Sequence, residues 1–130
     1  VDNLARFVAP GVVVAVVEED AHDPNHDPLR GNLTRLRAAS DATGKKLSVV
    51  TLPMPPPIVM DSTRLPASYA NFYVANEVVL VPLFGVHSDA RAVAILGELF
   101  PGREVIGIPS RDLVVGLGSV HCLTQQEPSL

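Results

Sequence analysis

Cysteine, tryptophan and long apolar runs are scarce in this sequence. Among the 130 residues there is a single cysteine, Cys122, and no tryptophan. One cysteine cannot form a disulfide within the chain, so nothing points to an oxidising compartment and a cytoplasmic location is expected. The longest apolar runs, such as Val12 to Val17, fall far short of the roughly 18 to 20 residues that a membrane-spanning helix needs. The sequence therefore predicts no membrane span.

Positive charge is also sparse. Ten Lys and Arg residues face 14 Asp and Glu residues, which gives a formal net charge of −4. The basic residues are scattered, so the chain lacks the positive patch with which proteins bind a nucleic-acid backbone. Hydrophobic residues make up 47% of the chain, which is enough for a buried core at this length. We expect one globular unit that does not bind nucleic acid.

The first half of the chain has the pattern of a strand, a helix and a strand. The β-branched run Val12 to Val17 predicts a strand that is buried on both faces. Asp27 before Pro28 is typical of a helix N-cap followed by proline in the first turn, and the helix is expected to end near Thr43-Gly44. Leu47 to Leu52 is predicted to form the next strand.

The second half has the same pattern. Tyr69 to Pro82 predicts two strands joined by a turn near Asn76, and a helix follows from Ser88 to the Pro101-Gly102 stop. Val105 to Ile108 then forms a short strand. A strand-helix-strand pattern that occurs twice predicts an α/β fold, for which a doubly wound sheet is the commonest arrangement.

Four prolines lie in the run Pro53 to Pro57, which separates these two halves. Proline lacks the backbone N–H that a central strand donates, so the run is predicted to be a loop. A rigid connector is the favoured interpretation. A polyproline ligand for a partner protein is the alternative.

Cys122 is the first candidate for chemistry, because it follows the glycine-rich stretch Gly116-Leu117-Gly118. Glycines allow close approach of the backbone, so a cysteine presented after them can lie exposed in a cleft as a nucleophile. The alternative is a buried structural cysteine. His121 is expected to face away from Cys122, because neighbours along a strand point to opposite faces.

Two other patterns give weaker signals. His22 and His26 are four residues apart, but Pro24 between them prevents a helix that would align the two imidazoles, and a solvated acidic loop is favoured over a metal site. Gly116-x-Gly118 lacks the third glycine and the lysine of nucleotide-binding loops. No metal and no cofactor are predicted.

The segment Gly116 to Pro128, GLGSVHCLTQQEP, resembles the C-terminal signature of the agmatine deiminases, a branch of the peptidyl-arginine deiminase superfamily. Further segments resemble the same family and keep its order along almost the whole chain: VDNLARF at 1–7, DPNHDPLRGNLTRL at 23–36, SYANFYVAN at 68–76 and LFPGREVIGI at 99–108. The match corresponds to about the C-terminal third of such an enzyme.

The resemblance implies a different fold from a doubly wound sheet. It implies a five-bladed α/β propeller of the pentein type, of which residues 1–130 would form about the last two ββαβ modules. It also implies a guanidino-group hydrolase without metal or organic cofactor, which converts agmatine to N-carbamoylputrescine and ammonia. Cys122 is the implied nucleophile, Asp2 the implied acceptor for the substrate guanidinium, and Gly116 and Gly118 belong to the implied substrate-binding loop.

The sequence also departs from the family pattern. The family's general acid and base, a histidine, would stand one residue before Val1, and a second guanidinium-binding acid would lie farther upstream. The usual Gly-Gly-Gly-Asn run reads Gly116-Leu117-Gly118-Ser119. The chain alone is therefore expected to be inactive. Peptidyl-arginine as the substrate and a non-catalytic truncated remnant are the alternatives, and the resemblance implies a homodimer.

Overall fold

The computed structural model describes residues 1–128, which form two units with the same order of elements. The first module contains β1 (Ala5–Ala9), β2 (Val12–Val17), α1 (His26–Ala38) and β3 (Ser48–Pro53). The second module contains β6 (Tyr73–Val74), β7 (Val78–Leu83), α2 (Asp89–Leu99) and β8 (Glu104–Pro109). Along the chain, a small hairpin of β4 (Val59–Met60) and β5 (Thr63–Arg64) follows the first module and precedes the second. Two 3-10 turns, η1 (Leu113–Gly116) and η2 (His121–Leu123), follow the second module.

Each module has its own three-stranded sheet with the same topology. β1 pairs with β2 antiparallel and β2 pairs with β3 parallel, and the same holds for β6, β7 and β8. The α/β prediction is therefore confirmed, whereas a single doubly wound sheet is wrong. Pairing stops at the end of β3 because the prolines that follow have no backbone N–H to donate.

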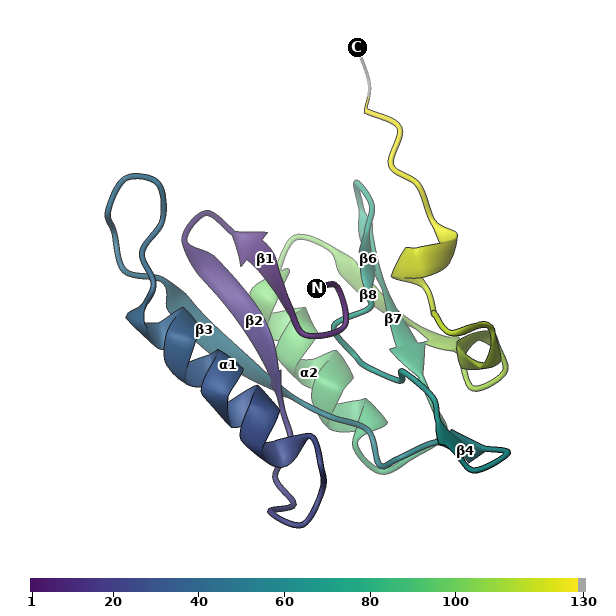
Figure 1. Ribbon diagram of the computed structural model, residues 1–130. Coiled ribbons are helices and arrows are strands. Elements are labelled where there is room, and N and C mark those ends of the chain that lie inside the picture. Colours follow the sequence, from purple (N-terminus) through teal and green to yellow (C-terminus); the bar gives the residue numbers. More distant parts are fainter. Residues whose placement is uncertain (129–130) are drawn as a thin grey trace.

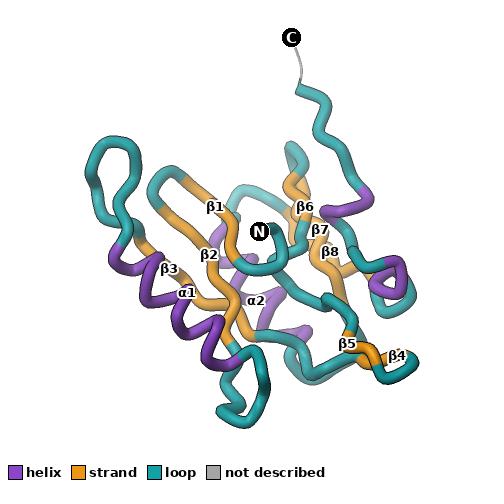
Figure 2. Tube along the Cα trace, viewed as in Figure 1, coloured by secondary structure: helices purple, strands orange, loops and turns teal. Residues whose placement is uncertain are grey.

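The two modules stack as four layers, in the order α1, first sheet, α2 and second sheet (Figures 1 and 2). The helix α2 contacts both β8 of its own module and β3 of the other one. One hydrophobic core accordingly runs through both modules, with Val14, Leu52, Leu96 and Val79 among its fully buried members. Within residues 1–128, neither helix has the length and apolar character needed to cross a membrane.

The first helix begins and ends at residues that differ from those predicted from the sequence. It begins at His26 after the N-cap Asn25, and it ends at Ala38 rather than near Gly44. Gly44 instead occupies a tight turn with a φ of 84°. The Asp41 carboxylate stabilises this turn by accepting hydrogen bonds from the backbone N–H groups of Thr43 and Lys45. The second helix begins after Ser88 as predicted.

The predicted hairpin is confirmed at its turn and wrong in its first strand. β6 comprises only Tyr73–Val74, while residues 68–72 form a buried loop. This loop bonds to distant segments, with Tyr69 reaching Asp89 near the start of α2. The predicted loop is confirmed for residues 54–57, but Pro53 is the last residue of β3 and pairs with Val17. Pro55 is fully buried, so the run cannot present itself as a polyproline ligand.

Candidate active site

Three segments that are far apart in the sequence meet around Cys122. They are the chain start at residues 1–4, the buried loop at residues 68–72 and the turn at residues 118–122. The Cys122 thiol is exposed and lies 3.5 Å from Asp2 Oδ2. The Asn71 side-chain amide donates to Cys122 Sγ at 3.1 Å. Two residues named from the sequence, Cys122 and Asp2, are thus brought together.

The glycine-rich stretch has different roles at its two glycines. A Cβ on Gly118 would lie 2.6 Å from Cys122 Cβ and 2.9 Å from Cys122 Sγ, so only glycine fits beside the thiol. At Gly116 nothing lies within 4 Å of such a Cβ. The left-handed conformation falls instead on Leu117, with a φ of 66°. A leucine therefore occupies, at a cost in strain, a conformation that suits the glycine usual in the family.

Asn71 connects all three segments and is the residue that sequence reasoning missed. Its side chain is fully buried, and its amide nitrogen donates to Asn3 Oδ1 at 2.8 Å and to Asp2 Oδ2 at 3.1 Å. Its Oδ1 accepts from Ser119 Oγ at 2.9 Å and from the His121 backbone N–H at 3.0 Å. Asn71 lies within the family-like SYANFYVAN segment, which was the one signal that could have found it.

His121 lies in the site as well. The expectation that it occupies a strand is wrong, because it begins the 3-10 turn η2. Its Nδ1 is 2.9 Å from Asp2 Oδ2. The imidazole and the Cys122 thiol therefore approach the same carboxylate oxygen, although the two residues are neighbours in the chain. A tight turn, unlike a strand, allows successive side chains to gather on one side.

Asp2 is held in its ionised form. The hydrogen bond from His121, opposed by burial and supported by the Cys122 thiol, lowers the pKa of the Asp2 carboxyl below its ordinary value. The Asp2 and His121 side chains are 35% and 37% exposed, so this charge is accessible to a ligand. A half-exposed carboxylate beside a thiol can receive a planar cation such as a guanidinium.

Bonds between the modules brace this arrangement. The Arg6 guanidinium stacks over the Phe72 ring at 4.3 Å and donates to the Phe72 carbonyl, which ties β1 to the buried loop. Burial lowers the pKa of Arg6, and the nearby Asp2 charge opposes this shift. Ser68 Oγ donates to the Asn3 carbonyl at 2.8 Å. The segments bearing Asp2 and Asn71 are thereby fixed relative to each other.

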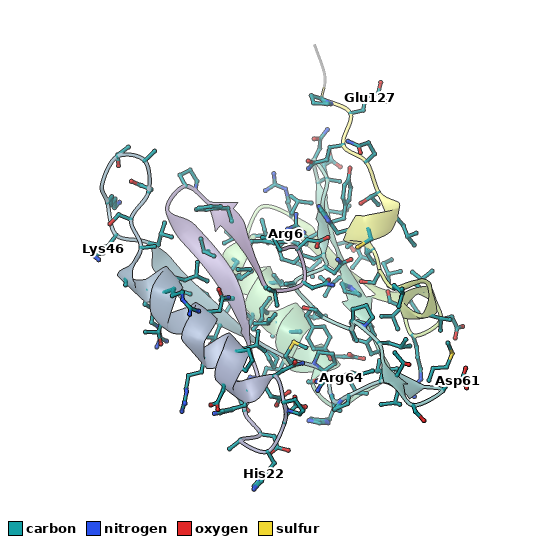
Figure 3. All side chains as sticks on the ribbon, in the orientation of Figure 1. Arg6, His22, Lys46, Asp61, Arg64 and Glu127 are labelled. Atoms are coloured by element: carbon teal, nitrogen blue, oxygen red, sulfur yellow. The ribbon has the colours of Figure 1, made fainter. Side chains whose placement is uncertain are left out.

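His22 and His26, the two histidines weighed as metal ligands, lie away from this site. His22 projects from the loop between β2 and α1 beside Asp20 (Figure 3), and His26 Nδ1 bonds to the Glu18 carbonyl at 2.8 Å. Among residues 1–128, no group of three or more His, Cys, Asp or Glu side chains could hold a metal ion. A cleft of about 380 Å³ near Glu18 and His87 is likewise separate from Cys122.

Comparison with known proteins identifies the family. The profile of the Porphyromonas-type peptidyl-arginine deiminases matches residues 1–128, so the chain belongs to this family. A Legionella pneumophila protein that is named provisionally as an agmatine deiminase is 39% identical over 129 residues. That match covers 98% of this chain and 37% of the Legionella protein.

Solved structures agree with this assignment. The agmatine deiminase of Enterococcus faecalis superimposes with a TM-score of 0.94 at 30% identity, over 98% of this chain and 40% of that one. A cysteine-to-serine variant of the C. jejuni agmatine deiminase, with substrate bound, gives a TM-score of 0.84 at 30% identity, over 92% and 34% of the two chains. The chain therefore spans about two fifths or less of the length of these relatives.

Proposed function

We propose that the chain carries the nucleophile of a guanidino-group hydrolase that converts agmatine and water to N-carbamoylputrescine and ammonia. The observation that carries the proposal is the approach of Cys122 Sγ to Asp2 Oδ2 at 3.5 Å. This pair combines a nucleophile with an acceptor for a planar cation. Relatives named as agmatine deiminases support agmatine as the substrate. The proposal concerns the activity of a protein with the full length of those relatives.

The proposed reaction has two covalent steps. The Cys122 thiolate attacks the guanidinium carbon to form a C–S bond, one amino group takes up a proton from water, and its C–N bond breaks as ammonia leaves. Water then attacks the same carbon and releases its two protons to solvent, the C–S bond breaks, and the ureido product and the thiolate are released. Asp2 accepts hydrogen bonds from the N–H groups of the guanidinium and so holds the guanidinium carbon near Cys122 Sγ. Side chains and water carry each step, so the proposal calls for no metal or organic cofactor.

The proposed setting of this site is a five-bladed propeller of the pentein type. Two ββαβ modules with the same strand order, stacked helix against sheet, support the view that such modules repeat around a ring. In that setting residues 1–130 form one catalytic unit with the remaining modules. Association of two such rings into a homodimer is part of the proposal, and sedimentation equilibrium of the full-length protein tests it by the measured mass.

The test uses the reading frame extended to the full length of the relatives. We expect release of ammonia and N-carbamoylputrescine from agmatine, and loss of both products on Cys122→Ala. Val59→Ala is the matched control, because it removes an exposed apolar side chain on β4 and leaves activity unchanged. Full activity of a folded Cys122→Ala protein contradicts the proposed nucleophile.

Peptidyl-arginine is the second candidate substrate, favoured by the matching family profile. The same assay with an arginine-containing peptide separates the candidates, because it yields peptidyl-citrulline instead of N-carbamoylputrescine. A folded full-length protein that acts on neither substrate supports the alternative of a non-catalytic remnant.

A further inference from the structure

The two oxygens of the Asp2 carboxylate have unequal surroundings. Oδ2 receives His121 Nδ1 at 2.9 Å, the Asn71 amide at 3.1 Å and the Cys122 thiol at 3.5 Å. Oδ1 faces the exposed ammonium group of Val1 at 3.9 Å, beyond hydrogen-bond distance. Within the described residues 1–128, the protein donors therefore gather on Oδ2, and none lies within hydrogen-bond distance of Oδ1.

We infer that His121 is a positioning residue for cation recognition, which fixes the Asp2 carboxylate so that Oδ1 is presented to the N–H groups of a guanidinium. The inference rests on the proposed function, in which Asp2 receives the substrate cation. It assigns His121 a role through Asp2 and no contact with the reacting atoms.

The backbone at His121 supports this role. Its N–H donates to both the carbonyl and the side-chain oxygen of Asn71, at 3.1 Å and 3.0 Å, so the residue is anchored before its ring meets Asp2. Because the ring nitrogen faces a carboxylate oxygen, Nδ1 is the protonated donor. An imidazole that donates from Nδ1 holds Asp2 Oδ2 in place.

The other charged groups around Asp2 are placed less well to orient it. Arg6 contributes positive charge, but its guanidinium is engaged with the Phe72 ring and carbonyl. The Cys122 thiol is a weak donor at a longer distance. His121 at 2.9 Å therefore acts together with the Asn71 amide at 3.1 Å as a short-range group that sets the direction of the carboxylate.

Two small electrophiles of nearly equal shape test the inference on the 130-residue chain. In 2-chloroacetamidine the reactive carbon carries a planar cationic amidinium, and in 2-chloroacetamide it carries a neutral amide. With either reagent the Cys122 thiol loses its proton to solvent, Sγ forms a bond to the carbon, the C–Cl bond breaks and chloride leaves. The ratio of the two alkylation rates reports recognition of the cation, whereas thiol exposure changes both rates alike.

We expect His121→Leu to lower this ratio by about tenfold or more, the effect of losing a hydrogen bond to a charged group. His121→Asn should restore it, because the asparagine amide places an N–H where Nδ1 stands. Circular dichroism verifies that each variant is folded. If His121→Leu does not fold, His121→Gln replaces it, since its amide lies one carbon farther out.

Asp2→Asn is the reference variant that separates the possible failures. If Asp2→Asn lowers the ratio and folded His121→Leu does not, the role of His121 is overturned and the role of Asp2 stands. If Asp2→Asn leaves the ratio unchanged, cation binding by Asp2 fails, and both the inference and that part of the proposed function fall. If His121→Leu slows both reagents equally, His121 only maintains the local structure and the inference is overturned.

Discussion

Gly118 is the residue whose identity depends most directly on the position of the thiol. An added methyl group would lie 2.6 Å from Cys122 Cβ, closer than real Cβ contacts allow. Gly118→Ala should therefore displace Cys122 and lower the free energy of unfolding by about 1–3 kcal/mol, as overpacking does. Urea titration followed by circular dichroism measures the change.

Gly116→Ala is the matched control for this prediction. The same methyl group meets nothing within 4 Å at Gly116, so the free energy of unfolding should change by less than about 0.5 kcal/mol. Equal losses at the two glycines would show that loop flexibility, and not the approach of Cys122, matters at both positions. The structure thus separates two glycines that the sequence treated as equivalent.

At this scale the sequence predicted the site in part. Cys122 and Asp2 could be named because a signature and a short motif carry them. Asn71 could not, since a lone asparagine has no chemical pattern and its side-chain partners are 48 to 69 positions away. The direction of the His121 side chain was predicted wrongly, because in a strand it would face away from Cys122. In the 3-10 turn η2 it reaches Asp2 instead.

At the scale of elements, Asp89 joins the start of α2 to the end of β7. Its carboxylate accepts from the backbone N–H groups of Phe84, Gly85 and Val86 and from the Tyr69 hydroxyl at 2.6 Å. Burial acts to raise the pKa of Asp89, but these hydrogen bonds outweigh it and the pKa is lowered. Burial and the hydrogen bond to Asp89 raise the pKa of the Tyr69 hydroxyl.

Asp89→Asn should destabilise the protein in a pH-dependent manner. A carboxyl whose folded-state pKa is lowered contributes its full stability above its unfolded-state pKa of about 3.9, and loses it as pH falls through the folded-state value. We expect the variant to be about 2 kcal/mol less stable at pH 7, with the difference shrinking below about pH 4. Urea titrations at several pH values measure it.

Asp27→Asn provides the comparison, because Asp27 is the first-turn aspartate of α1. Asp27 is exposed and pairs with Arg30 three positions later, so its loss should cost no more than about 0.5 kcal/mol. If both variants lost the same stability, a general charge effect at helix starts would explain the result, and the bonds of Asp89 would not.

The elements that the sequence predicted best are those decided by local composition. All residues from Val12 to Val17 except Ala15 are β-branched, and the segment forms the central strand β2. The apolar and aromatic residues from Tyr69 onward predict a strand, but residues 69–72 form a loop. Ser68 and Tyr69 bond to Asn3 and Asp89 in place of a neighbouring strand. Partners so distant in sequence cannot be read from a local pattern.

At the scale of the whole molecule, α2 lies between the two sheets and belongs to the core of both. Leu96 is fully buried in this helix. Leu96→Ala should lower the free energy of unfolding by about 2–5 kcal/mol. Because the core is shared, hydrogen exchange should accelerate at backbone amides of both β2 and β7.

Glu98→Ala on the exposed side of α2 is the control and should leave exchange in both sheets unchanged. Faster exchange confined to β7 after Leu96→Ala would show that the modules unfold independently. The expected result is one cooperative unit, in which neither module is stable without the other.

Because Asp2 and Cys122 lie near opposite ends of the chain, the site can form only late in its synthesis. A ribosome adds about 5–20 residues per second, so Asp2 leaves the peptidyl-transferase centre about 6 to 24 s before Cys122 is added. During this interval the carboxylate lacks both the thiol and the imidazole that later surround it. The nascent chain therefore passes through a stage in which β1 and β2 are complete but the site does not yet exist.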